Sequence, residues 1–213
     1  MKTTLKISAI LLLFLAFAAC KNKVEGTKAT TGEAKTAPAT NTSSSTTYRM
    51  NSGTLKWVGP KAIGNSHQGT ITLTNGNLAV AGEQIKGGDF EIDMGSIAVT
   101  DLEAGKGKEK LEGHLKNEDF SNVGEFPKGL FKIVQVTPVS GVQDATHNVT
   151  GNLTLKGIEK SITFPASIAV MGDKLSAVSP SFTINRTDWG IKYGSSGSFA
   201  DLQRIELLMM ILP

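Results

Sequence analysis

The sequence predicts an all-β domain with one short helix, folded as a closed or nearly closed antiparallel barrel of about eight strands. Three observations lead to this fold class. From residue 48 onward, apolar and polar residues alternate over short runs. Glycine and asparagine separate these runs at close spacing, as turns between strands do. One stretch rich in lysine and glutamate, residues 108–116, departs from alternation and has helical spacing instead.

The first predicted hairpin covers residues 70–80. Ile71 and Leu73 share one face of the strand 70–74. Asn75-Gly76 is typical of a tight hairpin turn. The apolar residues Leu78 and Val80 then return on the second strand.

The later strands follow from the same alternation of apolar and polar residues. Phe90, Ile92 and Met94 alternate with acidic residues, and Lys156-Gly157 predicts a second hairpin turn. Ile162, Phe164, Ala166 and Ile168 share one face of the next strand, and Phe182 and Ile184 share a face of another. The last run, residues 205–212, is apolar at odd and even positions alike, which predicts a strand buried on both faces.

The predicted helix spans residues 108–116. Leu111, His114 and Leu115 lie at helical spacing among lysines and glutamates, as in a short amphipathic helix. Many strands with one helix favour a barrel. A barrel of about eight strands is either filled by its own side chains or holds one small ligand, and the sequence pattern leaves these two interiors open.

The N-terminus has the pattern of an export signal, residues 1–19. Lys2 and Lys6 precede Ile7 to Ala19, an uncharged apolar run of 13 residues. This run is shorter than the roughly 20 residues that span a bilayer. Small residues then precede Cys20, the chain's single cysteine, in a pattern that resembles a bacterial lipobox. We expect Cys20 to be the lipid anchor, the alternative being an ordinary signal with an incidental cysteine.

Residues 20–47 are predicted to be the lipidated Cys20 followed by a disordered tether. The segment is rich in Thr, Ser, Ala and Lys and has almost nothing to bury, so the entropy cost of ordering it is not offset. The 27 residues of 21–47 have a typical reach of ~30 Å as a flexible coil. The folded domain is therefore predicted to be residues 48–213, held near a membrane surface.

The charge distribution argues against a nucleic-acid partner. The whole chain carries a net charge of +3, but residues 48–213 hold 16 basic and 17 acidic side chains. A nucleic-acid-binding domain needs a concentrated basic face, and the sequence has none.

Catalytic chemistry is poorly represented in the sequence. His67, His114 and His147 lie on different predicted elements, without metal-ligand spacing or a cysteine partner. No nucleophile elbow or phosphate-binding glycine loop occurs. We therefore expect a non-enzyme without a metal or cofactor. An enzyme with His67 or His114 as base is the least favoured alternative.

Eight short segments together resemble the YceI-like family of lipid- and polyisoprenoid-binding proteins. They occur in the family's order and cover essentially all of residues 48–213. The segments are Trp57-Val58-Gly59 with Lys61, His67-Gln68-Gly69, Gly88–Met94 with Ile97, His114-Leu115-Lys116, Asp119-Phe120, Phe126-Pro127 with Phe131, Gly151–Gly157 and Arg186–Ile191. The resemblance implies a lipocalin-like barrel with a long tunnel for an isoprenoid or acyl chain, and a polar head group near its opening.

Two sets of site residues follow from this resemblance together with the alternation. The candidates for the ligand-binding wall are Ile71, Phe90, Ile92, Met94, Phe131, Phe164 and Phe182. The candidates for head-group contact are His67, His114, Arg186 and Asp188. For the two histidines the alternative is a structural hydrogen bond, and for Arg186 and Asp188 a salt bridge that stabilises a turn.

The function predicted from the sequence is a membrane-anchored, non-catalytic lipoprotein that binds or carries a long-chain amphiphile. The ligand classes considered are an isoprenoid quinone, a polyprenyl phosphate and a fatty-acid derivative. The expected location is the bacterial cell envelope, with the domain facing the periplasm. The open alternatives are a filled barrel that contacts another envelope protein and a homodimer.

Overall fold

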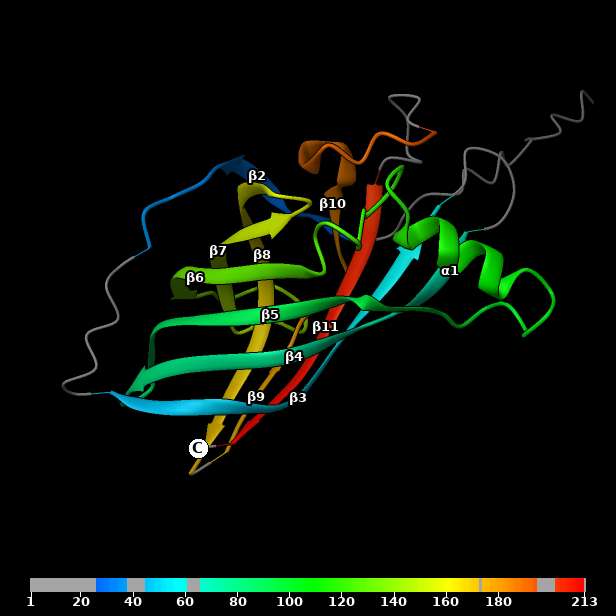
Figure 1. Ribbon diagram of the computed structural model, residues 1–213. Coiled ribbons are helices and arrows are strands. Elements are labelled where there is room, and N and C mark those ends of the chain that lie inside the picture. Colours follow the sequence, from blue (N-terminus) through cyan, green and yellow to red (C-terminus); the bar gives the residue numbers. More distant parts are fainter. Residues whose placement is uncertain (1–25, 38–44, 61–65, 173, 195–201, 213) are drawn as a thin grey trace, which may run out of the picture.

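The computed structural model describes residues 26–37, 45–60, 66–172, 174–194 and 202–212. For residues 51, 52 and 202–212 it describes the backbone alone. Among these residues the chain forms eleven strands, one α-helix and one 3-10 turn. All of the strands belong to one sheet (Figure 1).

Eight strands close into a ring, which confirms the predicted antiparallel barrel. Neighbouring strands pair antiparallel around the ring in the order β11, β3, β4, β5, β6, β7, β8, β9 and back to β11. Their bounds are β3 Thr46–Gly59, β4 His67–Ala81, β5 Gln84–Val99, β6 Lys128–Pro138, β7 His147–Leu155, β8 Ile158–Met171, β9 Lys174–Val178 and β11 Leu202–Leu212.

Helix α1, Lys108–Lys116, has the predicted bounds. The backbone N–H of Val99 donates to the carboxylate of Glu112 at 2.8 Å, which fixes α1 to the end of β5. The 3-10 turn η2, Arg186–Trp189, leads into the same region, because the ring of Tyr193, four residues after η2, lies 4.2 Å from that of His114 in α1. We call this the helix end of the barrel. The opposite hairpin end carries the turns at Gly82 and Gly172.

Three short strands fill the gap between β8 and β11 at the helix end. β10, Phe182–Asn185, pairs with β11. β1, Thr27–Lys28, pairs with β10, and β2, Thr30–Glu33, pairs with β8. Since β1 and β2 are consecutive, residues 26–35 form one extended segment in the wall, which we call the strap.

The strap corrects the prediction that residues 20–47 are disordered throughout. Ala29 is 2% exposed and belongs to the core. The backbone N–H of Lys35 donates to the Asn152 side-chain oxygen at 3.0 Å, and the Asn152 amide donates back to the Lys35 carbonyl at 2.7 Å. The strap orders because its backbone pairs with two open strand edges, a gain that side-chain composition does not reveal. Cys20 and the signal segment lie outside the described residues.

The predicted turn at Asn75-Gly76 is also wrong. Both residues lie inside β4, where the register shifts by a bulge. The hairpin turn comes later, at Gly82, whose φ of +60° suits glycine. The turn at Lys156-Gly157 is confirmed, and positive φ at both residues is typical of a type I′ hairpin turn.

Alternation places the apolar side chains inside the barrel, as expected for strands with a period of two. Phe90, Ile92 and Met94 of β5 are buried, as are Ile162, Phe164 and Ala166 of β8. The prediction that the last strand is buried on both faces concerns side chains outside the described residues.

Candidate apolar ligand cavity

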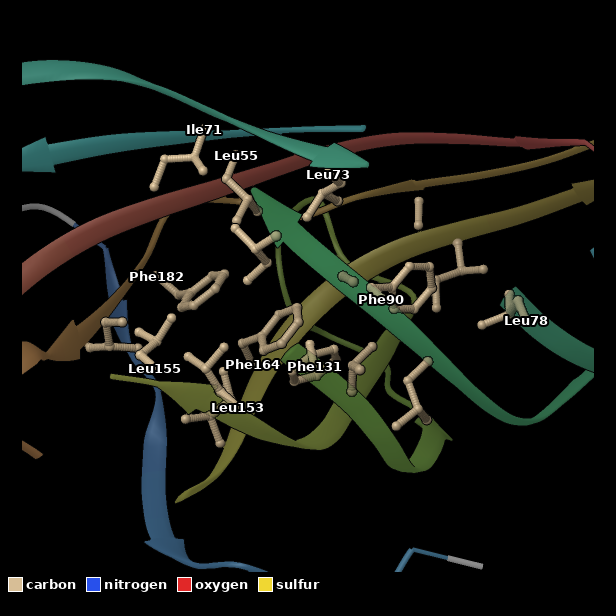
Figure 2. Close-up of a pocket in the computed structure, with 18 of the residues that line it drawn as sticks. Leu55, Ile71, Leu73, Leu78, Phe90, Phe131, Leu153, Leu155, Phe164 and Phe182 are labelled. Carbon is tan, nitrogen blue, oxygen red and sulfur yellow. The ribbon is translucent and has the colours of Figure 1, made fainter. Parts of the chain in front are cut away.

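The barrel contains a cavity of about 150 Å³, lined in the described part of the chain only by apolar side chains (Figure 2). Leucine, isoleucine, valine, methionine, phenylalanine and alanine account for every lining residue. They come from β3 to β10 and extend from Leu55 and Ile184 near the helix end to Leu78 and Leu175 near the hairpin end. Such a lumen can hold hydrocarbon and cannot solvate a charge.

Four phenylalanine rings occupy the lumen, as Figure 2 shows. The rings of Phe164 and Phe182 are stacked, with centroids 4.4 Å apart and planes 13° apart. Phe131 lies 5.8 Å from Phe164. Phe90 pairs with Phe131 across β5 and β6. Together the rings form an apolar surface along the cavity.

Glycines opposite two of these rings create space in the lumen. A Cβ added to Gly76 would lie 2.3 Å from the Phe90 ring, and one added to Gly151 would lie 2.3 Å from the Phe131 ring. The rings therefore occupy space that a side chain at these two positions would fill. This explains why β4 carries a glycine at position 76, which sequence reasoning had assigned to a turn.

The cavity is small for the long tunnel that the resemblance implies. Sites for drug-sized ligands measure roughly 300–1,000 Å³. A dry apolar cavity of the size observed here, 150 Å³, holds a molecule about as large as benzene. A long chain therefore fits only if the phenylalanine rings move.

All seven predicted wall residues line this cavity: Ile71, Phe90, Ile92, Met94, Phe131, Phe164 and Phe182. Sequence reasoning missed others, among them Leu55, Leu175 and Ala177. Leu175 and Ala177 lie on β9, where apolar and polar residues alternate over only five residues, too few to predict a strand. Contact of the seven predicted residues with a ligand stays a prediction.

Of the predicted head-group residues, Arg186 is buried at the helix end and bonds to the backbone. Its guanidinium donates to the carbonyls of Ile191 at 2.6 Å and Tyr193 at 2.8 Å. It also lies 5.6 Å from the centroid of the Phe120 ring. These contacts fix the loop that follows η2, as expected for a structural arginine.

His114 lies close to the same cluster. Its ring is 4.2 Å from the Tyr193 ring and 6.0 Å from that of Phe120. Tyr193 is largely exposed. The structure therefore brings His114 and Arg186 to one aromatic cluster, while Asp188 lies on η2, half-buried.

His67 lies apart from this cluster, at the start of β4. Its Nδ1 contacts Asp101 Oδ2 at 2.8 Å, and the Gln68 N–H donates to the other oxygen of Asp101 at 3.0 Å. Partial burial acts to raise the pKa of Asp101, but the hydrogen bonds from Gln68 and His67 outweigh it and lower the pKa below its ordinary value. His67 thus ties the start of β4 to the end of β5.

The described residues contain no group of three or more His, Cys, Asp or Glu side chains that could hold a metal ion. Within the same ranges, no helix has the length and apolar character needed to cross a membrane.

Comparison with known proteins gives one family and several structural neighbours. The YceI-like domain matches residues 15–209. A UPF0312 protein of Pseudomonas putida is 26% identical over 129 residues, covering 58% of this chain and 63% of that protein. A UPF0312 protein of Pseudomonas aeruginosa is 31% identical over 103 residues, covering 46% of this chain and 50% of that protein. The chain thus spans less than two thirds of the length of these relatives.

Two solved structures share the fold at low sequence identity. BcnA of Burkholderia cenocepacia superposes with a TM-score of 0.59 at 18% identity, covering 74% of this chain and 95% of that one. A polyisoprenoid-binding domain from Saccharophagus degradans gives a TM-score of 0.52 at 11% identity, covering 78% and 97%.

Proposed function

This chain belongs to the YceI-like domain family, and we propose that it binds a long-chain amphiphile in its barrel without catalysis. The observation that carries the proposal is the cavity, whose described lining is apolar throughout. The ligand classes that suit it are an isoprenoid quinone, a polyprenyl phosphate and a fatty-acid derivative. The polyisoprenoid-binding neighbour from Saccharophagus degradans supports this choice.

An apolar chain gains affinity from burial alone. Each buried methylene contributes about 0.8 kcal/mol, so several carbons suffice for useful binding without a charged contact. Movement of the Phe164 and Phe182 rings would enlarge the cavity, and the ligand's carbons would replace the contacts of the stack. The stacking contributes about 0.5–1.5 kcal/mol beyond burial, which a long chain exceeds.

We assign the polar head group to the helix end. Arg186, His114 and Tyr193 bring polar groups together there, whereas the described lining of the lumen offers no polar side chain. Tyr193 and His114 are the groups able to meet a head group directly, since they are more exposed than Arg186. His67 and Asp188 remain candidates for the same role.

Membrane anchoring and location in the cell envelope are part of the proposal. The pattern of Lys2, Lys6, the apolar run and Cys20 supports a lipid anchor. Attachment through two or more acyl chains would hold the barrel stably at a periplasm-facing surface. The prediction of a homodimer stands beside it.

A filled barrel that contacts another envelope protein is the second candidate. The small volume of the cavity, about 150 Å³, favours it. On that alternative the phenylalanine rings are permanent core residues and do not move for a ligand.

Mass spectrometry separates the two functions. The chain carrying Cys20→Ser is purified from a bacterium without detergent and weighed under native and denaturing conditions. An apolar adduct in one-to-one ratio, released on denaturation, supports lipid binding. A bare protein that also fails to bind added isoprenoid quinone or palmitate supports the filled barrel.

A pair of alanines on β8 provides the variant and its control. Ala166 is buried and lines the cavity, while Ala169 is exposed on the same strand. Ala166→Leu adds three carbons to the lumen, so we expect about tenfold or greater loss of affinity. Ala169→Leu should leave affinity unchanged, and equal loss in both variants would contradict lumen binding.

A further inference from the structure

The strap buries very few side chains for a part of the barrel wall. The side chains of Thr27, Lys28, Thr30 and Glu33 are exposed, and Thr31 is half-buried. Ala29 contributes the only buried side chain of strands β1 and β2 with the residue between them. By contrast, β5 buries Phe90, Ile92 and Met94. Segments with few buried apolar contacts open at a lower free energy than the rest of a fold.

The strap has a different partner on each side. Its first residues donate backbone hydrogen bonds along β10. Ala29 donates to the Thr183 carbonyl at 2.9 Å, and Thr27 donates to the carbonyl of Ser181, the residue before β10, at 3.1 Å. Its later residues pair with β8, where Thr31 lies opposite Ile162. In Figure 1 β2 lies at the same end of the barrel as η2. If the strap detaches, the edges of β8 and β10 that face it lose their backbone pairing partner.

Residues on both sides of this seam line the cavity, although no residue of the strap does. Phe182 of β10 lies opposite Thr27, and Ile162 of β8 lies opposite Thr31. Both residues line the cavity, as does Phe164, whose ring stacks on Phe182. Departure of the strap therefore uncovers the stacked rings that must move before a long chain can fit.

The strap also lies next to the predicted anchor. Gly26 is the sixth residue after Cys20, which limits the distance between them to about 20 Å even when the chain is fully extended. An acylated Cys20 would hold the seam within that distance of the bilayer that contains the ligand.

We propose that the seam filled by residues 26–35 is a lateral access site, through which an apolar chain passes between the bilayer and the lumen when the strap detaches. The proposal rests on the function proposed above and names the route to its site. The ligand class is an unbranched or isoprenoid hydrocarbon chain, because the seam opens on Phe164, Phe182 and Ile162.

A disulfide across the seam tests the route. Thr30 and Thr163 are directly opposite on antiparallel strands, where Cα atoms are about 4.5–5.5 Å apart, within the range that a disulfide spans. The full chain carries Cys20→Ser, which removes its only thiol, together with Thr30→Cys and Thr163→Cys. Ser167→Cys with Val178→Cys, opposite each other on β8 and β9, is the matched control.

The readout is the rate at which N-phenyl-1-naphthylamine, a fluorescent apolar probe, enters and leaves the protein. We expect the oxidised strap pair to slow both rates by about tenfold or more, with unchanged equilibrium affinity and recovery on reduction. The oxidised control pair should leave the rates unchanged. Equal rates in the oxidised and reduced strap pair would overturn the access route while leaving the binding function intact.

Thiol labelling measures the opening of the strap without any ligand. Ala29→Cys and Ala166→Cys are both buried positions, one in the strap and one in the continuous wall. We expect Ala29→Cys to react with a maleimide at least about tenfold faster. Equal labelling rates would overturn the proposal even if the probe binds. Absence of probe binding to the reduced protein would instead overturn the proposed function, and the access route with it.

Discussion

Two segments of this barrel close the same gap between β8 and β11, and they do so in different ways. β9 closes the hairpin end, pairing on both sides and burying Leu175 and Ala177. The strap, together with β10, closes the helix end and buries Ala29 alone among residues 27–33. β9 follows β8 through a tight turn, whereas the strap comes from the far N-terminal part of the chain. β9 is held by backbone pairing on both sides and by buried side chains, whereas the strap is held mainly by backbone hydrogen bonds.

The largest expected effect on the free energy of unfolding comes from removing a buried side chain of β9. Leu175 is 1% exposed and lines the cavity, so Leu175→Ala should lower the free energy of unfolding by about 2–5 kcal/mol. Val178→Ala on the same strand, at a residue 42% exposed, should cost no more than about 0.5 kcal/mol. Urea unfolding measures both, and a similar cost for the two variants would contradict the difference in burial.

The second largest effect on stability is expected at Arg186, which holds the segment that follows η2. A lysine cannot donate to the Ile191 and Tyr193 carbonyls in the geometry of a guanidinium. Arg186→Lys should therefore lower the free energy of unfolding by about 1–3 kcal/mol. Lys192→Arg, at an exposed position in the same loop, is the control. A neutral result for Arg186→Lys in thermal unfolding would show that this loop does not depend on the guanidinium.

The third variant weakens the strap itself. Asn152→Ala removes both hydrogen bonds to the Lys35 backbone, at an expected cost of about 0.5–1.5 kcal/mol. Hydrogen exchange should speed up in the strap and stay slow in β5. Asn148→Ala, on the same strand and half-buried, should change neither. Uniform acceleration throughout the barrel would mean that the strap and the ring unfold as one unit.

The smallest effect is a dependence on pH at the start of β4. The pKa of Asp101 is lower in the folded protein than its ordinary value of 3.8. The ionised carboxylate therefore stabilises the fold above that value, and this contribution disappears as the pH falls through the lower, folded pKa. Asp101→Asn should reduce the difference in melting temperature between pH 6 and pH 3. An unchanged difference would show that the contact with His67 and Gln68 contributes nothing to stability.

The parts of the fold that depend on side-chain pattern were predictable from sequence. Alternation identified the inward faces of β5 and β8, helical spacing gave the bounds of α1, and Lys156-Gly157 marked a true hairpin turn. The strap was missed because its stability comes from backbone groups of β8 and β10, which no side-chain pattern encodes. The prediction of a turn at Gly76 was wrong because the sequence around a glycine that makes room for an aromatic ring is the same as that around a glycine in a turn.

The candidate site was also predictable from the sequence only in part. The wall residues were predictable because burial and alternation coincide in a barrel. The contacts of His67 and Arg186 were not predictable, because their partners, Asp101 and the carbonyls of Ile191 and Tyr193, are set by loop geometry. The volume of the lumen also depends on how the rings lie over Gly76 and Gly151, which needs three-dimensional structure.

The pairing of β3 with β11 has a consequence for how the chain folds. β3, the first strand of the ring, cannot complete its pairing until β11, the last strand, has formed. The strap likewise cannot pair until β8 and β10 have formed. Contacts between such distant parts of a sequence slow folding, and no intermediate synthesised from the N-terminus alone can seal the lumen. The barrel is thus open along one side until its last strand docks, so a hydrocarbon present at that moment can be enclosed as the protein folds.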